Sequence, residues 1–213
     1  TQIQDIARTI ILRDGLEGLT MSRLARGLNT SPSALYRYYE SKESLIVDLQ
    51  VQAIGEIEES LIGKLEAFEI AGAKATDESV RALLKCFVAF DVYAEGGGES
   101  GRGLIDAFLS QPKPFLSVAQ AQEVNQRLSR VLGLCVRTLD EAVQLNALEE
   151  GDNVQRTHLL WASLHGLGHF RKRDRIQPAE LQANALKSAL YSTLFRGFGA
   201  KEDVLERALV GFD

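Results

Sequence analysis

Proline is scarce in this sequence, with 4 residues among 213. Because proline interrupts helices, its scarcity leaves long stretches of the chain free to remain helical. No stretch alternates apolar and polar residues as a half-buried strand would, whereas apolar residues recur at helical spacing along the chain. We therefore predict an all-α fold.

Cysteine is scarcer still, and long apolar runs are missing. Cys86 and Cys135 lie in helical patterns among apolar neighbours, which predicts two buried, free thiols. No run is long and apolar enough to cross a bilayer, and no signal peptide is recognisable. We expect a cytoplasmic protein without a membrane partner. The sequence starts at Thr1 rather than at a methionine, so a basic arm could precede it.

Positive charge is in deficit overall, since the formal net charge is −5. Such a balance is unusual for a protein that binds nucleic acid, but the charge is unevenly distributed. Within residues 18–42, cationic side chains outnumber carboxylates: Arg23, Arg26, Arg37 and Lys42 against Glu40. A locally basic segment on an acidic body can still bind DNA.

Residues 20–42 have the pattern of two short helices joined by a tight turn. Thr20 can cap the first helix through its hydroxyl, and Asn29 can adopt the left-handed backbone of a sharp turn. Ser31 and Pro32 are typical of the start of a second helix. Apolar residues at i, i+3, i+4 and i+7 give the first helix one buried face: Met21, Leu24, Ala25 and Leu28.

The second helix is predicted over Pro32–Glu40, with Leu35 and Tyr39 packed against the first helix. Small residues at its start allow close approach to base edges, while phenols and a guanidinium supply hydrogen bonds to phosphates and bases. The outward side chains are Ser33, Ala34, Tyr36, Arg37 and Tyr38. This is the layout of a helix-turn-helix, with Pro32–Glu40 as the recognition helix.

The segment around this motif contains an apolar first helix ending at Gly15, then G-L-x-x-L-T, L-A-x-x-L-N-T-S and L-Y-R-Y-Y-x-S-K-E-S-L. In these features residues 3–49 resemble the N-terminal domain of the tetracycline-repressor (TetR/AcrR) family of bacterial transcription regulators. The family usually has glycine and a small aliphatic residue where this chain has Asn29 and Thr30, and both of these fit the turn. The resemblance implies a helix-turn-helix domain over residues 1–46. A long helix would join it to a helical effector-binding and dimerisation domain over residues 47–213.

Motif and resemblance together predict a DNA-binding surface. Tyr36, Tyr38 and Lys42 are expected at phosphates, and Ser33, Ala34 and Arg37 near bases. The full predicted set is Thr20, Ser22, Ser31, Pro32, Ser33, Ala34, Tyr36, Arg37, Tyr38 and Lys42. The expected partner is double-stranded operator DNA.

A glycine-rich segment, E-G-G-G-E-S-G-R-G over residues 95–103, interrupts the helical patterns. Its spacing does not fit a Walker loop, and no strand precedes it. We predict a loop between helices there, with no stable helix.

Apolar residues of the central helical patterns are candidates for an effector pocket: Phe87, Phe90, Tyr93, Phe108, Leu128, Leu132, Trp161 and His165. Composition alone leaves open whether they line a pocket or fill a core. The resemblance favours a pocket, because the C-terminal domain of the family binds a small effector between its central helices. We expect an apolar or amphipathic effector that releases a repressor from its operator.

Two late helical patterns carry stripes of leucine and small residues that permit close helix approach. Two such helices from each subunit can form a four-helix bundle across a two-fold axis. We predict a homodimer interface made of Leu160, Leu164, Leu167, Leu181, Ala185 and Ala189.

The three histidines, His158, His165 and His169, share one helical face. His165 and His169 have the spacing of a metal pair, but no third strong ligand is near in sequence. We predict packing or hydrogen bonding rather than metal binding. Trp161, His165 and Gly166 form a W-x-x-x-H-G string, which resembles a subgroup of TetR-family C-terminal domains.

Serine, histidine and aspartate are all present, but no nucleophile motif such as G-x-S-x-G occurs. We predict no catalytic site and no cofactor, and our hypothesis is a ligand-responsive, homodimeric transcriptional regulator. One alternative is a metal-dependent hydrolase built on the helical body, which metal analysis of the purified protein would test. Another is an architectural DNA binder whose DNA affinity no small molecule changes.

Overall fold

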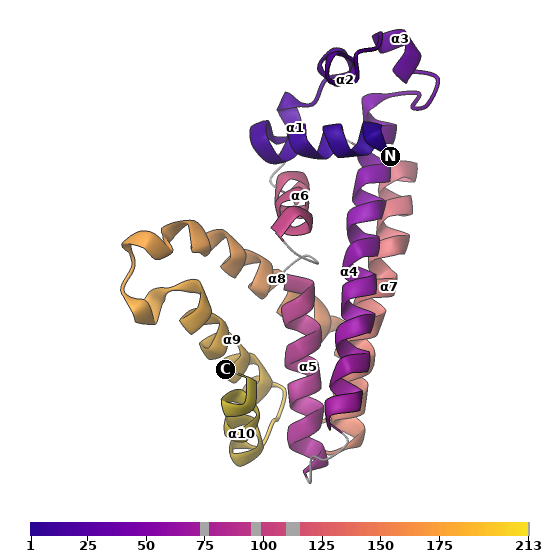
Figure 1. Cartoon of the computed structure of the whole chain (residues 1–213). Helices are drawn as coiled ribbons and strands as arrows, with labels where there is room; N and C mark the ends of the chain where they lie inside the picture. Colours follow the sequence, from indigo (N-terminus) through magenta and orange to yellow (C-terminus); the bar gives the residue numbers. More distant parts are fainter. Residues whose placement is uncertain (73–76, 95–98, 110–115, 213) are drawn as a thin grey trace. The chain divides into compact units, whose positions relative to one another are not determined.

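The computed structural model describes residues 1–72, 77–94, 99–109 and 116–212. Regular structure in these residues is entirely helical, as the sequence predicts (Figure 1). The α-helices are α1 (Gln2–Gly18), α2 (Met21–Gly27), α3 (Pro32–Leu35), α4 (Lys42–Gly72), α5 (Glu78–Ala94), α6 (Glu99–Leu109), α7 (Val118–Gln144), α8 (Asn153–Phe170), α9 (Ala183–Gly197) and α10 (Glu202–Phe212). Two 3₁₀ helices, η1 (Arg171–Ile176) and η2 (Ala179–Leu181), lie between α8 and α9. No helix among the described residues is long and apolar enough to cross a membrane.

Contacts divide the chain into two compact units, and the division falls inside α4 and inside α7. The first unit comprises Thr1–Glu59 and Glu95–Val131, and the second comprises Ser60–Ala94 and Leu132–Asp213. The three N-terminal helices therefore share a unit with α6 and with the first part of α7. The functional boundary at residue 46 stays a prediction.

Helix α1 begins with a capping box, in which the Thr1 hydroxyl accepts from the Gln4 amide and the Gln4 side chain accepts in return. Its regular geometry breaks at Gly15, where φ is 73° and ψ is 177°, as the predicted end of the first helix requires. Its apolar face packs into a core that unites α1, α2, α3, α4 and α6. The largest fully buried members of this core are Ile11, Leu19, Leu24, Leu35, Leu45, Ile46 and Leu49.

Helix α6 contradicts the expected loop over residues 95–103, because the helix begins at Glu99. Residues 95–98 lie outside the described part of the chain. The cause is packing against α1: a Cβ added at Gly103 would lie 2.6 Å from Leu12 Cδ2. Small residues let α6 approach α1 closely, and Leu104 and Phe108 enter the core of the first unit. Burial thus outweighs the low helix propensity of glycine.

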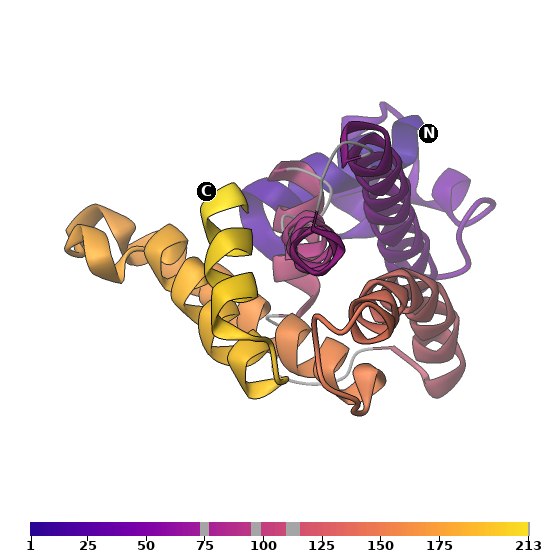
Figure 2. The ribbon, with the colours of Figure 1, turned by 90° about the horizontal axis from the view of Figure 1, so that it is seen from below.

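The second unit packs α5 against α8 and α10, and α9 against α8 and α10 (Figure 1). Figure 2 shows α8 and α9 meeting at the turn that contains η1 and η2. An aromatic cluster forms its centre: the Phe87 ring centroid lies 4.9 Å from that of Tyr191, 4.9 Å from that of Phe195 and 5.5 Å from that of Phe212. These rings come from α5, α9 and α10, so the cluster joins distant parts of the sequence.

Candidate nucleic-acid interface

Helix α2 and the turn after it have the geometry that the sequence predicts. The Thr20 hydroxyl accepts a hydrogen bond from the Arg23 amide (3.2 Å) and so caps α2. Asn29 adopts φ of 51°, in the left-handed region. The amide of Asn29 donates to the Arg26 carbonyl (3.2 Å), and that of Thr30 donates to the Ala25 carbonyl (3.0 Å). These bonds satisfy carbonyls that the end of a helix would otherwise leave open.

Helix α3 begins as predicted. Ser31 has extended backbone, and its hydroxyl accepts from the Ala34 amide at 3.3 Å. Pro32 occupies the first turn, where no amide hydrogen is needed. The Ser31 hydroxyl also lies 2.8 Å from that of Ser33. The start of α3 is therefore fixed by local hydrogen bonds.

The recognition helix is shorter than Pro32–Glu40, because the α-helix ends at Leu35. Beyond it the chain continues in hydrogen-bonded turns, with the amides of Tyr38 and Tyr39 both donating to the Leu35 carbonyl, at 2.9 and 3.0 Å. The chain must turn here towards Ser41, whose hydroxyl caps the first turn of α4. We call residues Ser31–Tyr39 the reading segment.

The predicted DNA-contacting side chains of the reading segment are accessible. Tyr36 is 51% exposed and Tyr38 is 70% exposed. Leu35, by contrast, is 2% exposed and anchors the segment in the core. Ala34 is half-buried, and the other predicted residues before Lys42 are exposed: Thr20, Ser22, Ser31, Pro32, Ser33 and Arg37.

Two partly buried hydrogen bonds to one carboxylate hold the end of the reading segment in place. The Tyr39 hydroxyl donates to Asp48 Oδ2 at 2.6 Å, and Gln4 Nε2 donates to the same oxygen at 2.7 Å. Burial and the nearby carboxylate raise the pKa of the Tyr39 phenol, so it remains a neutral donor. One carboxylate on α4 thus ties the reading segment to α1. Sequence reasoning missed Asp48 and Gln4, because their separation along the chain matches no motif.

Arg23, which contributes to the basic balance of this region, is used to hold the fold. It forms an ion pair with Asp14, and its Nη1 donates to the Gly18 carbonyl at 3.2 Å. Hydrogen bonds from Arg13 and Arg23 lower the pKa of the Asp14 carboxyl. Arg23 is therefore engaged with α1 rather than free for a phosphate.

Lys42 lies at the start of α4, as predicted, and is half-buried. Its Nζ donates to the Leu16 carbonyl at 3.2 Å, next to the break in α1 at Gly15. Arg26 and Arg37 are exposed, and neither has an ion pair with another described residue. These two arginines are the accessible cations of the helix-turn-helix.

The structure divides the predicted effector residues between the two units. Phe108 packs in the core with α1, and Leu128 also belongs to the first unit. The remaining described residues of the set belong to the second unit: Phe87, Phe90, Leu132, Trp161 and His165. Phe87 and Phe90 are fully buried, whereas Trp161 and His165 are half-buried. The Tyr93 side chain lies outside the described structure, and effector binding by this set stays a prediction.

The predicted dimer residues also differ in burial. Leu160 and Leu164 are buried within the second unit, and Leu167 is half-buried. Leu181, Ala185 and Ala189 are exposed. Leu167 and Ala189 line a largely apolar groove of about 500 Å³ between α8 and α9, together with Ser163, Gly166, Phe170, Leu186, Leu190 and Thr193. Dimerisation through these helices stays a prediction.

The rings of the three histidines and of Trp161 follow one another along α8, each near the next. Ring centroids lie 6.2 Å apart for His158 and Trp161, 6.3 Å for Trp161 and His165, and 6.0 Å for His165 and His169. His158 Nδ1 also lies 2.8 Å from the Val154 carbonyl oxygen. Within the described residues, no three potential metal ligands come together.

The two thiols are buried and free, as predicted. Cys86 Sγ donates to the Thr138 carbonyl at 3.3 Å. Burial raises the pKa of both Cys86 and Cys135 to about 12, so neither thiol is a reactive thiolate near neutral pH.

Comparison with known proteins shows which proteins this chain resembles. Residues 3–49 match the family described as bacterial regulatory proteins, tetR family. The HTH-type transcriptional regulator BetI of Rhizobium meliloti is 28% identical over 184 residues, which cover 84% of this chain and 80% of that protein.

Solved structures share the fold. The transcriptional regulator FadR from Bacillus subtilis, in complex with stearoyl-CoA, has a TM-score of 0.63 at 18% identity, covering 92% of this chain and 97% of that one. AibR in complex with isovaleryl coenzyme A and operator DNA has a TM-score of 0.62 at 15% identity, covering 91% and 96%. The match over residues 3–49 and the similarity to BetI, together with the capped helix-turn-helix, identify the chain as a DNA-binding transcriptional regulator.

Proposed function

We propose that this chain binds operator DNA as a homodimer and represses transcription until a small amphipathic effector releases it. The observation that carries the proposal is the reading segment. Its main chain is fixed by capping bonds and by the Tyr39–Asp48 hydrogen bond, while Tyr36, Arg37 and Tyr38 remain exposed. Rigid support with accessible polar side chains is what recognition of a DNA groove requires.

The DNA contacts divide by chemistry. Ser33 and Ala34 are small enough for close approach to base edges, and Arg37 can form bidentate hydrogen bonds with guanine. Tyr36 and Tyr38 supply phenolic donors to phosphates. Lys42 releases the Leu16 carbonyl, at 3.2 Å in the free protein, when a phosphate offers a charged acceptor.

The groove between α8 and α9 supports dimerisation. Leu167, Phe170 and Leu190 line it, and Phe170 is 47% exposed. Packing two such faces about a two-fold axis would cover them, and the axis would match the symmetry of a palindromic operator. The W-x-x-x-H-G string of α8 lies on the same helix, and the subgroup that it suggests remains part of this proposal.

Acyl thioesters are the effector class to test first. Two proteins of the same fold are complexes with stearoyl-CoA and isovaleryl coenzyme A. An acyl chain needs apolar surroundings, and the second unit is rich in aromatic side chains around Phe87 and Trp161. Trp161 is the only tryptophan of the chain, so its fluorescence reports directly on ligands near α8.

The proposal is tested by selecting DNA from a random library and measuring affinity for the selected sequence by fluorescence anisotropy. Acyl-CoAs of different chain lengths should lower that affinity and change Trp161 fluorescence, while free CoA serves as the control. Compounds that change Trp161 fluorescence but leave operator affinity unchanged would contradict effector release. Failure to select any sequence would contradict operator binding.

Dimerisation is tested in parallel by analytical ultracentrifugation. Ala189→Arg places a charge in the α8–α9 groove, where burial without a partner would cost several kcal/mol. We expect this variant to be monomeric and to bind operator weakly. Ala119→Arg, at an exposed position on α7, is the matched control and should remain dimeric. A dimeric Ala189→Arg variant would move the interface elsewhere.

A further inference from the structure

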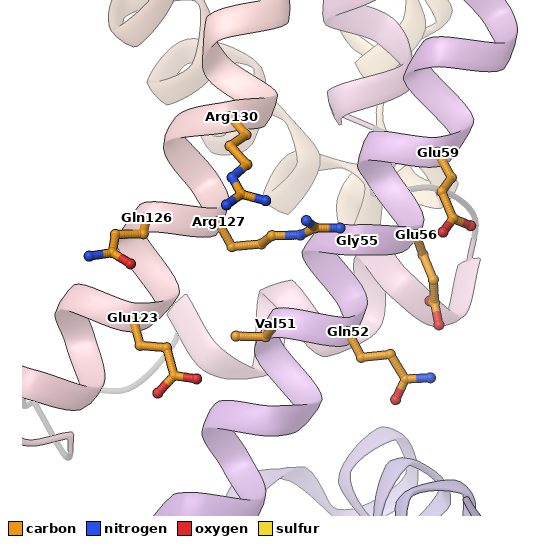
Figure 3. A pocket seen from close by; sticks show the side chains of 9 residues that line it. All are labelled: Val51, Gln52, Gly55, Glu56, Glu59, Glu123, Gln126, Arg127 and Arg130. Carbon is orange, nitrogen blue, oxygen red and sulfur yellow. The ribbon is translucent and has the colours of Figure 1, made fainter.

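The first unit contains a polar groove that neither the helix-turn-helix nor the predicted effector residues use. It lies between α4 and α7 and has a volume of about 620 Å³ (Figure 3). All its lining residues belong to the first unit: Val51, Gln52, Gly55, Glu56, Glu59, Glu123, Gln126, Arg127 and Arg130. Hydrogen-bonding side chains dominate this lining, which makes it suited to a polar ligand.

Two arginines one helical turn apart reach into this groove from α7. Figure 3 shows the Arg127 side chain reaching from α7 towards α4 at Gly55, and the Arg130 side chain pointing towards that of Arg127. A Cβ added at Gly55 would lie 3.2 Å from Arg127 Nη2, which is tighter than ordinary van der Waals contact. The absence of a side chain at Gly55 is therefore what leaves room for the guanidinium.

The hydrogen-bonding capacity of these arginines is only partly used. Arg127 Nη2 pairs with Glu58 Oε2 at 2.8 Å, but its Nε is buried and has no hydrogen-bond partner among the described residues. Arg130 is exposed and forms no ion pair or hydrogen bond with any residue that the structure describes. An anionic acceptor placed between the two guanidinium groups would form charge-assisted hydrogen bonds with them, which are stronger than hydrogen bonds between neutral groups.

The carboxylates that line the groove form no ion pair with Arg127 or Arg130, and Glu58, which pairs with Arg127, is not part of the lining. Glu56 is held by Arg8 in a bidentate ion pair with distances of 3.1 and 2.7 Å. Figure 3 shows Glu56 and Glu59 pointing away from the arginines. Glu123 lies one turn before Arg127 and has no ion pair with a described residue. Arg130 therefore has no carboxylate partner among the described residues.

We propose that this groove binds the anionic group of a small polar molecule, a phosphate or a carboxylate, between Arg127 and Arg130. The anion accepts from the guanidinium groups of Arg127 and Arg130, both of which line the groove from α7. The lining of the groove includes none of the predicted effector residues. The site does not rest on the proposed function, because its test needs no DNA.

The test is isothermal titration calorimetry on the full-length protein with two probes, inorganic pyrophosphate and succinate. Both are titrated at constant ionic strength, since salt screens charge–charge attraction. Saturable binding of pyrophosphate alone would assign a phosphate site, and saturable binding of succinate alone a carboxylate site. Binding of neither probe would overturn the proposal.

Two substitutions locate the site, each with a matched control. Arg130→Gln removes the charge of a side chain without a described partner, and we expect at least tenfold weaker binding. Arg137→Gln, at an exposed position farther along α7, should bind as the wild type does. Equal binding by wild type and Arg130→Gln would place the anion elsewhere and overturn the proposal.

Gly55→Ala tests the space beside the Arg127 guanidinium. The added methyl group must displace that guanidinium, so the probe should bind more weakly although the helix itself remains intact. Gly63→Ala is the control on the same helix, because a Cβ there meets nothing within 4 Å. Circular dichroism checks the helical content of all four variants. Weakening by Gly63→Ala equal to that by Gly55→Ala would exclude the proposed geometry.

Discussion

The reading segment and the aromatic cluster of the second unit are built in opposite ways. In the reading segment, hydrogen bonds between residues a few positions apart fix the main chain, and the functional side chains stay exposed. In the cluster, rings from α5, α9 and α10 hold one another, and Phe87, Tyr191 and Phe195 are fully buried. Substitutions of exposed residues in the reading segment should therefore change DNA binding. Substitutions in the aromatic cluster should change the stability of the fold.

The largest effect is expected in the aromatic cluster. Phe87→Ala removes a fully buried ring that contacts three others, so the free energy of unfolding should fall by about 3–5 kcal/mol. Urea denaturation followed by circular dichroism measures it. Val210→Ala, at a position that is 82% exposed, is the control and should change stability by less than about 0.5 kcal/mol. A similar loss in both variants would remove the contrast between the cluster and the surface.

The reading segment should show the reverse behaviour. Arg37→Ala should cost about 1–3 kcal/mol in operator binding and relax the preference at one base pair, with unfolding unchanged. Lys42→Ala should weaken binding to all sequences alike and reduce the salt slope by roughly one. Anisotropy titrations at several salt concentrations measure both effects, and Lys64→Ala, exposed on α4, is the control. Unchanged operator binding by the first two variants would refute the assigned reading segment.

The buried thiols make the second unit sensitive to alkaline pH. Burial raises the pKa of Cys86 and Cys135 from 9.0 to about 12, so the unfolded chain loses these protons first. The stabilisation is fully present below pH 9 and is lost as pH rises towards 12. Between pH 8 and pH 10 each thiol should lower the free energy of unfolding by about 1.4 kcal/mol.

Urea denaturation at the two pH values measures this loss in the wild type, Cys86→Ala and Cys135→Ala. Each variant should lose less stability on going to pH 10 than the wild type does. Equal losses in all three proteins would show that other groups cause the pH dependence.

The smallest effect is expected at Tyr39, which supports the reading segment, and at its exposed neighbour Tyr38. Tyr39→Phe removes the hydrogen bond to Asp48, which should cost about 1 kcal/mol of stability and also weaken operator binding. Tyr38→Phe removes an exposed hydroxyl and should weaken operator binding without changing stability. Denaturation and anisotropy on both variants distinguish the two roles. Loss of stability in Tyr38→Phe would contradict its exposed position.

Features decided by near neighbours in sequence could be predicted. The caps at Thr20 and Ser31 and the left-handed turn at Asn29 are confirmed, because each depends on backbone groups within a few residues. The all-helical fold is confirmed for the described residues for the same reason, since apolar spacing along each helix is a local property.

Features decided by distant contacts could not be predicted. The recognition helix was expected to reach Glu40, but the turn towards α4 ends it at Leu35. The packing of Phe108 in the core with α1 was not foreseen, and its predicted role in effector binding stays a prediction. Asp48 went unnoticed because its partners, Gln4 and Tyr39, lie on α1 and in the turn after α3. In each case the deciding neighbour is a residue that no local pattern identifies.

The packing of α6 on α1 limits where this protein can be truncated without exposing its core. A fragment that ends after α4 contains the whole segment that matches the family, yet it lacks Leu104 and Phe108, which are buried against α1. Such a fragment would expose an apolar face to water and tend to aggregate. A protease that cleaves between α4 and α6 in the folded protein would leave that face covered for as long as the two pieces stay together. The compact unit that contains the helix-turn-helix is therefore discontinuous in sequence.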